Sequence, residues 1–314
     1  MNEQSCSRQY SSFSFGRYLR LVAVISVLAF SFHVHSEEPL HVLLTNDDGF
    51  DAPGITAMHE ALVSAGYKVS VAAPRQQQSG SSMKVTLGAM DVEQTSEHFW
   101  VIEGTPADSV SFALLKLLPN NRPDIVISGI NFGQNLGTNT NLSGTVGAAI
   151  MATHFSIPAI AISVGLDLAE RDAKPIRFPS TMAAFAPAAE FTAKMLRQIE
   201  LSRDPSASLL PASTVLNINY PAIPTGTIKG VRMAQVAHVG GFVPNYVAGD
   251  VPGKYTATLA HGAPEDGSSA NPDTALFSDG YITISVLDGD LNANVTDDDK
   301  LKGRIEQFLS NPVK

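Results

Sequence analysis

Short apolar runs that alternate with segments of helical periodicity constrain the fold of this chain more than any other feature of its sequence. The apolar runs have the length of buried strands, and they occupy residues 40–45, 68–73, 99–104, 124–129 and 159–163. Between them, apolar residues recur at helical spacing over 51–65, 105–118 and 145–155. This order predicts an α/β fold, a Rossmann-like and mostly parallel sheet flanked by helices on both faces.

The C-terminal part departs from this alternation. Residues 174–212 are Ala-rich and helical in pattern, and we expect Pro187 to kink or break that helix. Strands are predicted at 215–222 and 280–288, and a final helix at 296–309. Gly, Pro, Asn and Asp are frequent over 238–275, which indicates β-hairpin arms and loops in a C-terminal extension.

The N-terminal segment has the pattern of a secretory signal peptide. A polar stretch with three Arg precedes the apolar run LVAVISVLAFSF at 21–32, and small residues follow, so cleavage is expected after Ser36. Twelve apolar residues fall short of the about 20 that span a bilayer, which leaves an uncleaved interfacial anchor as the alternative. We therefore expect export to the periplasm or the medium, with residues 1–36 removed and no stable membrane insertion afterwards.

The composition excludes several classes of protein. With 30 acidic and 21 basic residues the formal charge is −9, which argues against a nucleic acid polymer as partner. A single cysteine, Cys6, excludes a disulfide-stapled scaffold.

Three polar clusters follow three of the predicted strands. The first is Asn46-Asp47-Asp48-Gly49, where adjacent carboxylates repel each other unless a cation offsets the cost. The second is 78–82, rich in Ser and Gly, and the third is 128–145, a Gly-rich loop that ends with Ser and Thr at a helix start. Taken alone, the first cluster is as compatible with a surface turn, the second is more typical of a flexible loop, and the third is also explained by ordinary helix capping. Because parallel strands end at one edge of the sheet, all three are expected to meet there, and a metal site beside an anion site indicates a phosphate ester substrate.

Nine stretches of the chain match one known family, in that family's order, from residue 43 to 287: LLTNDDGFDAPGI, APRQQQSGSS, GTPADSV, PDIVISGINFGQNLG, SGTVGAA, PAIAIS, LNINYPA, IKGVRM and DGYITISVL. Through these stretches the chain resembles the SurE family, the stationary-phase survival proteins that act as metal-dependent nucleotidases.

The resemblance implies a role for individual residues. It implies metal ligation by Asp47, Asp48, Ser79 and Asn131, with one Mg²⁺, Mn²⁺ or Ca²⁺ per subunit. It also implies phosphate contacts from Asn135, Ser143 and Thr145, and the helix start adds Gly144 as an N–H donor. The catalytic set is then Asp47, Asp48 and Asn135, and either carboxylate could handle the attacking water.

These roles predict a metal-dependent phosphomonoesterase that hydrolyses nucleoside 5′- and 3′-monophosphates, or another small phosphomonoester. The alternatives are a broad acid phosphatase or polyphosphatase, and a non-catalytic nucleotide-binding protein. An aspartyl-phosphate mechanism with a D-x-D pair is disfavoured, because Gly49 stands two residues after Asp47.

The resemblance also implies a domain organisation. It predicts a Rossmann-like core at 37–235 and, at 236–314, a hairpin and swapped extension with a C-terminal helix that builds a homodimer or homotetramer. Leu142 replaces the aromatic residue usual before the SGT segment, which predicts weaker base stacking. Arg75 is expected either to contact phosphate or to be simply exposed, and His154 is expected in the core.

Overall fold

The computed structural model describes residues 38–172, 177–204, 206–261, 267, 269–290 and 306. The chain divides into two units, Met1–Glu38 and Pro39–Lys314, and all helices and strands named below belong to the second. The predicted signal peptide at 1–36 and the predicted helix at 296–309 lie outside the described residues, apart from Glu306, which is helical.

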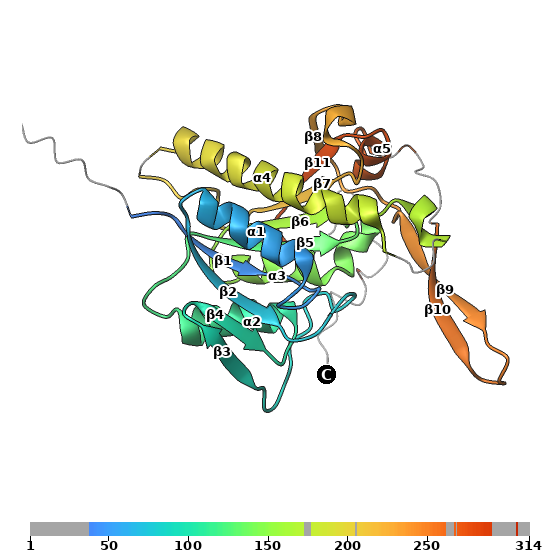
Figure 1. The fold of residues 1–314 in the computed structure, drawn as a ribbon, viewed down its shortest axis with the longest axis horizontal. Helices are drawn as coiled ribbons and strands as arrows, with labels where there is room; N and C mark the ends of the chain where they lie inside the picture. Colours follow the sequence, from blue (N-terminus) through green and yellow to red (C-terminus); the bar gives the residue numbers. More distant parts are fainter. Residues whose placement is uncertain are drawn as a thin grey trace, which may run out of the picture. The chain divides into compact units, whose positions relative to one another are not determined.

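A nine-stranded, mostly parallel sheet forms the centre of this unit, in the order β3-β4-β2-β1-β5-β6-β7-β11-β8 (Figure 1). The six parallel strands in its middle are β4 (Phe99–Ile102), β2 (Lys68–Pro74), β1 (His41–Thr45), β5 (Ile125–Phe132), β6 (Ala159–Val164) and β7 (Val215–Tyr220). Outside them, β3 (Val92–Ser96) and β11 (Ile282–Leu287) run antiparallel to β4 and β7, and β8 (Val231–Ala234) pairs in parallel with β11. The predicted fold class is therefore confirmed.

Helices cover both faces of the sheet. α1 (Pro53–Ser64) and α4 (Pro179–Ser202) pack on one face, and α2 (Pro106–Phe112) and α3 (Gly144–Thr153) on the other. Along β1, Val42 and Leu44 point into the first core while Leu43 points into the second. Each strand in the middle of the sheet is buried on both sides, which is why its sequence reads as a continuous apolar run.

Several elements differ from the sequence expectation. Pro187 neither breaks nor ends α4, a helix of 24 residues that contains it. Its neighbours Ala184, Phe185, Ala188 and Ala189 are buried, so packing against the sheet compensates for the lost backbone hydrogen bond. The helix expected at 105–118 is α2 followed by a π-helical turn at Ala113–Leu117. Strands β3 and β8 and the short helix α5 (Asp273–Ser278) were not predicted.

The expected hairpin is present as a separate two-stranded sheet of β9 (Phe242–Ala248) and β10 (Tyr255–His261). It stands away from the main sheet in Figure 1. Tyr246 pairs with Ala257 and Ala248 with Tyr255, so the two tyrosines share one face of the hairpin, where both are 68% exposed. The division of the chain at 235 stays a prediction, and β11 from its C-terminal side lies in the main sheet.

Within the described ranges, we find no helix with the length and apolar character needed to span a membrane.

Candidate active site

The loops that follow β1, β2 and β5 meet at a cleft of about 760 Å³. It is lined by five of the residues singled out in the sequence: Asp47, Ser79, Asn131, Asn135 and Ser143. The remaining three, Asp48, Gly144 and Thr145, lie directly behind this lining, in contact with its residues or adjacent to them in the chain. All eight are brought together because the parallel strands of the sheet end at this edge.

Asp47 is the most buried charged group of the cleft, with 2% of its surface exposed. The hydroxyl of Thr145 donates a hydrogen bond of 2.5 Å to its Oδ1. Burial raises the pKa of Asp47, and the hydrogen bond from Thr145 only partly opposes this rise. The chain thus holds a carboxylate where the charged form is disfavoured.

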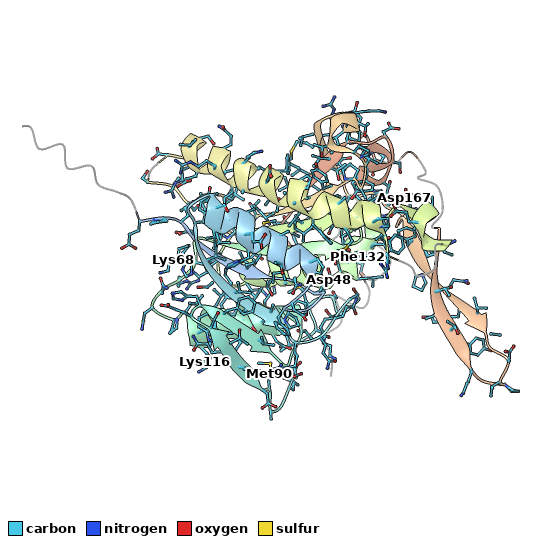
Figure 2. The ribbon with its side chains drawn as sticks, viewed as in Figure 1. Asp48, Lys68, Met90, Lys116, Phe132 and Asp167 are labelled. Carbon is cyan, nitrogen blue, oxygen red and sulfur yellow. The ribbon has the colours of Figure 1, made fainter. Side chains whose placement is uncertain are left out.

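Asp48 is anchored on the neighbouring strand end. Its Oδ2 accepts a hydrogen bond of 2.8 Å from the backbone N–H of Phe132, and Figure 2 shows the two residues near each other. Burial and the adjacent charge of Asp47 raise the pKa of Asp48 to about 7. Two carboxylates in this environment are stabilised by a cation placed between them and water.

Further oxygen atoms stand close by without partners. Asn131 donates through its Nδ2 to the carbonyl of Gly133 at 2.6 Å, while its buried Oδ1 and the buried Oγ of Ser81 accept or donate no hydrogen bond. Ser79 is exposed and lines the same cleft. In the part of the chain that the structure describes, no three His, Cys, Asp or Glu side chains cluster as a metal site, so a cation here would rely on amide and hydroxyl oxygens as well.

The N-terminus of α3 faces the carboxylates. Ser143 caps the helix, since its Oγ accepts from the N–H of Val146 at 3.1 Å. Gly144 follows because there is no room for a side chain: a Cβ there would lie 2.8 Å from Ser81 Oγ and 2.9 Å from Asp47 Cβ. The close approach lets the positive end of the helix dipole and the hydroxyl of Thr145 reach Asp47.

Asn135 is 8% exposed and is held on several sides. Its Nδ2 donates to Ser163 Oγ at 2.9 Å, and its backbone bonds with the side chains of Asn217 and Asn219 on β7. Sequence reasoning did not single out these three residues. The signal was present in the alternation of Asn and apolar residues in LNINY, because Asn inside a buried strand is unusual.

Residues 42–240 match the family model described as "Survival protein SurE". The chain belongs to the SurE family. The predicted family is therefore confirmed, and so is the fold, since a crystal structure of the SurE protein from Aquifex aeolicus superimposes with a TM-score of 0.66. That protein shares 27% sequence identity, and the match covers 86% of this chain and all of the other.

Two relatives match this chain over most of their own length. The 5′-nucleotidase SurE of Alkalilimnicola ehrlichii is 36% identical over 258 residues, which cover 80% of this chain and 90% of that protein. The 5′/3′-nucleotidase SurE of Photorhabdus laumondii is also 36% identical, with 81% of this chain and 92% of that protein covered. The predicted enzyme class agrees with the names of these relatives.

Leu142 stands where the resemblance to the family predicted an aromatic residue. It lines the cleft and is 50% exposed. Phe132, Phe178 and Phe242 line the same cleft, and the rings of Phe132 and Phe178 meet edge to face at 5.7 Å. Sequence reasoning missed these aromatic residues, because Phe178 and Phe242 lie far from the motifs in the chain.

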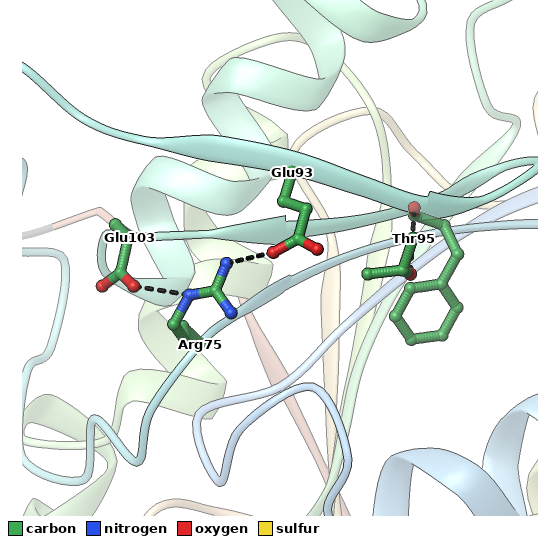
Figure 3. A network of polar contacts seen from close by, with 5 residues as sticks. Arg75, Glu93, Thr95 and Glu103 are labelled. Carbon is green, nitrogen blue, oxygen red and sulfur yellow. Dashed lines mark hydrogen bonds and ion pairs between the residues drawn. The ribbon is translucent and has the colours of Figure 1, made fainter.

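Two sequence expectations are corrected. Arg75 is not simply exposed: it forms ion pairs of 2.7 Å with Glu93 and 2.5 Å with Glu103, which tie β2 to β3 and the end of β4 (Figure 3). His154 is exposed rather than packed in the core, and it is the residue at which α3 ends.

Proposed function

We propose that this SurE protein is a divalent-metal-dependent phosphomonoesterase that hydrolyses nucleoside 5′- and 3′-monophosphates to nucleoside and phosphate. One observation carries the proposal: two carboxylates, a free amide oxygen and a helix N-terminus converge at one end of a cleft. The names of the relatives, 5′-nucleotidase and 5′/3′-nucleotidase, support the substrate class.

The oxygen atoms fit a hard divalent cation. Asp47 and Asp48 supply charge, Asn131 Oδ1 is buried without a partner, and Ser79 stands at the rim of the same cleft. We propose that these residues hold one Mg²⁺, Mn²⁺ or Ca²⁺ per subunit. When bound, such a cation supplies Lewis-acid polarisation of the phosphoryl group.

The residues of the chain supply positioning and charge stabilisation. Asn135 and the hydroxyl of Ser143 donate hydrogen bonds to phosphoryl oxygens, with the N–H of Gly144 at the helix start. Thr145 acts through Asp47, whose Oδ1 it engages. One of the two Asp carboxylates takes up the proton of the attacking water, and the apolar wall with Phe178 and Phe242 receives the nucleoside.

Phosphate release tests this proposal. The purified protein is stripped with a chelator and given back Mg²⁺, Mn²⁺ or Ca²⁺, with nucleoside 5′- and 3′-monophosphates, p-nitrophenyl phosphate and polyphosphate as substrates. Asp48→Asn should abolish the metal-restored release, whereas Asp51→Asn should retain it, because Asp51 is an exposed carboxylate of the same loop.

The outcomes separate the candidate functions. Release that prefers nucleotides supports the proposal, while equal release from all monoesters or from polyphosphate favours a broad acid phosphatase. No release with any metal, from folded protein that still binds nucleotide, would leave a nucleotide-binding role for this cleft.

We also propose that the protein is exported and assembles as a homodimer or homotetramer. The apolar run at 21–32 supports export, and fractionation of cells with N-terminal sequencing of the product tests it. The exposed Tyr246, Tyr255 and Val247 of the hairpin support assembly, because such residues on an isolated two-stranded sheet gain free energy when a second copy covers them. Light scattering of the wild type beside Tyr246→Ser measures this.

A further inference from the structure

Asn217 and Asn219 lie two residues apart on β7 and are both completely buried. Residues at this spacing point to the same face of a strand. Their apolar neighbours on the same strand, Ile218 and Tyr220, belong to the core on the opposite face. Two buried amides side by side are costly unless their polar atoms find partners, so their contacts reveal what they do.

Asn219 binds the backbone of Asn135 at two points. Its Oδ1 accepts from the N–H of Asn135 at 2.7 Å, and its Nδ2 donates to the carbonyl of Asn135 at 3.1 Å. A neighbouring strand would make the same pair of bonds to an extended residue. In the loop after β5, the side chain of Asn219 therefore makes the two hydrogen bonds to the Asn135 backbone that a neighbouring strand would otherwise make.

Asn217 adds a second donor to the same carbonyl, with Nδ2 at 3.0 Å. Ser163 on β6 accepts from the side-chain amide of Asn135 at 2.9 Å. The backbone of Asn135 is thus fixed by three hydrogen bonds from β7, and its side chain by one from β6.

The arrangement costs free energy that a purely structural strand would avoid. Asn217 Oδ1 is buried without a hydrogen-bond partner. A strand that served only the sheet would carry apolar side chains at these buried positions and would bury no amide oxygen without a partner. Natural proteins tolerate such unpartnered buried polar atoms mainly at functional sites.

We propose that Asn217 and Asn219 are positioning residues for the reaction: they fix the backbone of Asn135, so that its side-chain amide is aimed at the substrate phosphate. This inference rests on the proposed function, in which Asn135 contacts phosphate. Asn217 and Asn219 do not line the cleft and act through Asn135.

A double-mutant cycle tests the inference. Asn219→Leu is combined with Asn135→Ala, and kcat and KM are measured with a nucleoside monophosphate for both single variants and the double variant. We expect Asn219→Leu to lower kcat by about a hundredfold, the size typical of a small misplacement, with a much smaller change in KM. In the Asn135→Ala background the same substitution should change kcat less than about threefold, because both act through one group.

Thr283→Val is the matched control. Thr283 faces Asn219 across the β7–β11 pair, is completely buried and has an unpartnered Oγ1, and so makes no side-chain hydrogen bond to Asn135. It should keep wild-type kcat. Independent, multiplicative losses in the cycle, or an equal loss in Thr283→Val, would overturn the inference, because they would reveal general damage to the sheet.

Two further measurements cover other outcomes. If Asn219→Leu fails to fold, Asn217→Ala takes its place, because it removes one of the two donors to the Asn135 carbonyl without adding volume, and the same coupling with Asn135→Ala is expected. If the wild type releases no phosphate, the proposed function fails. The affinity for inorganic phosphate in the presence of Mg²⁺ is then measured for the wild type, the two single variants and the double variant. Coupling between Asn219 and Asn135 in that affinity supports the inference, whereas additive effects or no phosphate binding overturn it.

Discussion

Asp47 in the loop after β1 and Asp108 at the start of α2 are buried almost equally, with 2% and 4% of their surface exposed. Their pKa values nevertheless shift in opposite directions. Burial raises the pKa of Asp47. Burial also acts to raise the pKa of Asp108, but hydrogen bonds from Thr86 and Thr105 outweigh it, so the net shift is downward.

The difference lies in how deeply each carboxylate is desolvated, which is more for Asp47, and in the donors that surround it. Asp108 accepts from the backbone N–H of Thr86 at 3.0 Å and from that of Thr105 at 2.8 Å, and it completes a capping box. Asp47 faces another carboxylate, and the hydroxyl of Thr145 together with the backbone N–H groups of Asp47 and Thr145 offsets its burial only in part. Burial alone therefore does not mark a functional carboxylate: the fold satisfies Asp108 with hydrogen-bond donors and satisfies Asp47 only in part.

Asp47→Asn is the change with the largest expected effect on activity. Loss of a direct cation ligand should lower metal-restored phosphate release by more than about a hundredfold, since even changes outside the first ligands cost up to that much. In chelator-treated protein the same change should raise Tm, because a buried charge beside a like charge disappears. Phosphate assays measure the fall in activity, and thermal unfolding with and without Mg²⁺ measures the change in Tm. A lower Tm in the metal-free state would contradict the view that Asp47 is unsatisfied.

Gly144→Ala should come next. Its Cβ would lie 2.8 Å from Ser81 Oγ and 2.9 Å from Asp47 Cβ, so the helix start must move away from the carboxylate. We expect a loss of about 1–3 kcal/mol of stability, as overpacking usually costs, together with a clear fall in kcat. Gly226→Ala is the control, because a Cβ there meets nothing within 4 Å. Equal kcat values for the two variants would show that close approach at Gly144 is unimportant.

Asp108→Asn should weaken the fold far more than the chemistry. It removes a carboxylate that accepts several hydrogen bonds and should cost about 1–2 kcal/mol at pH 7, the usual value for a lost helix cap. Because the folded pKa of Asp108 is lowered, its stabilisation is complete above the unfolded value near 3.9 and is lost as pH falls through the folded value. Urea unfolding of both proteins from pH 7 to pH 3 should therefore show the difference shrinking below about pH 4. A difference that stays constant with pH would contradict the assignment.

Arg75→Ala should have the smallest effect. Its two ion pairs with Glu93 and Glu103 lie at the surface, and the Arg75 side chain is 33% exposed, so the loss of stability should not exceed about 1 kcal/mol. Phosphate release should be unchanged within about twofold, in contrast to a residue that stabilises the transition state. A large rise in KM would instead show that Arg75 leaves the glutamates to bind phosphate. Urea unfolding and steady-state kinetics check both.

The sequence predicted those elements whose pattern is visible in a few consecutive residues. Strands β1, β2, β4, β5 and β6 were predicted because they read as short apolar runs, as strands buried in the middle of a sheet do. β3, with four of its five residues exposed, and β8, with three of its four exposed, give no such run and were missed. Pro187 was expected to disrupt a helix, but its cost is set by packing along α4, which no local pattern reports.

The same holds for the residues of the site: those within local motifs were predicted, and those linked only through the fold were not. The motifs identified Asp47, Asp48, Asn131, Asn135 and Ser143 because each lies in a short polar stretch at or after the end of β1 or β5. Ser163, Asn217 and Asn219 were missed because their link to Asn135 crosses about 28 to 84 residues of sequence.

The sequence by itself determined the fold class, the family and the sheet edge at which the polar residues gather, because strand periodicity and short motifs are local properties. Only the tertiary structure decided which side chains are left without partners. Asp47 and Asp108 are both acidic residues in polar stretches, and Arg75 stands in a loop beside the site. Their different roles follow from the donors and charges that the fold places around them, since a hydrogen bond depends on distances of about 3 Å that distant segments set together.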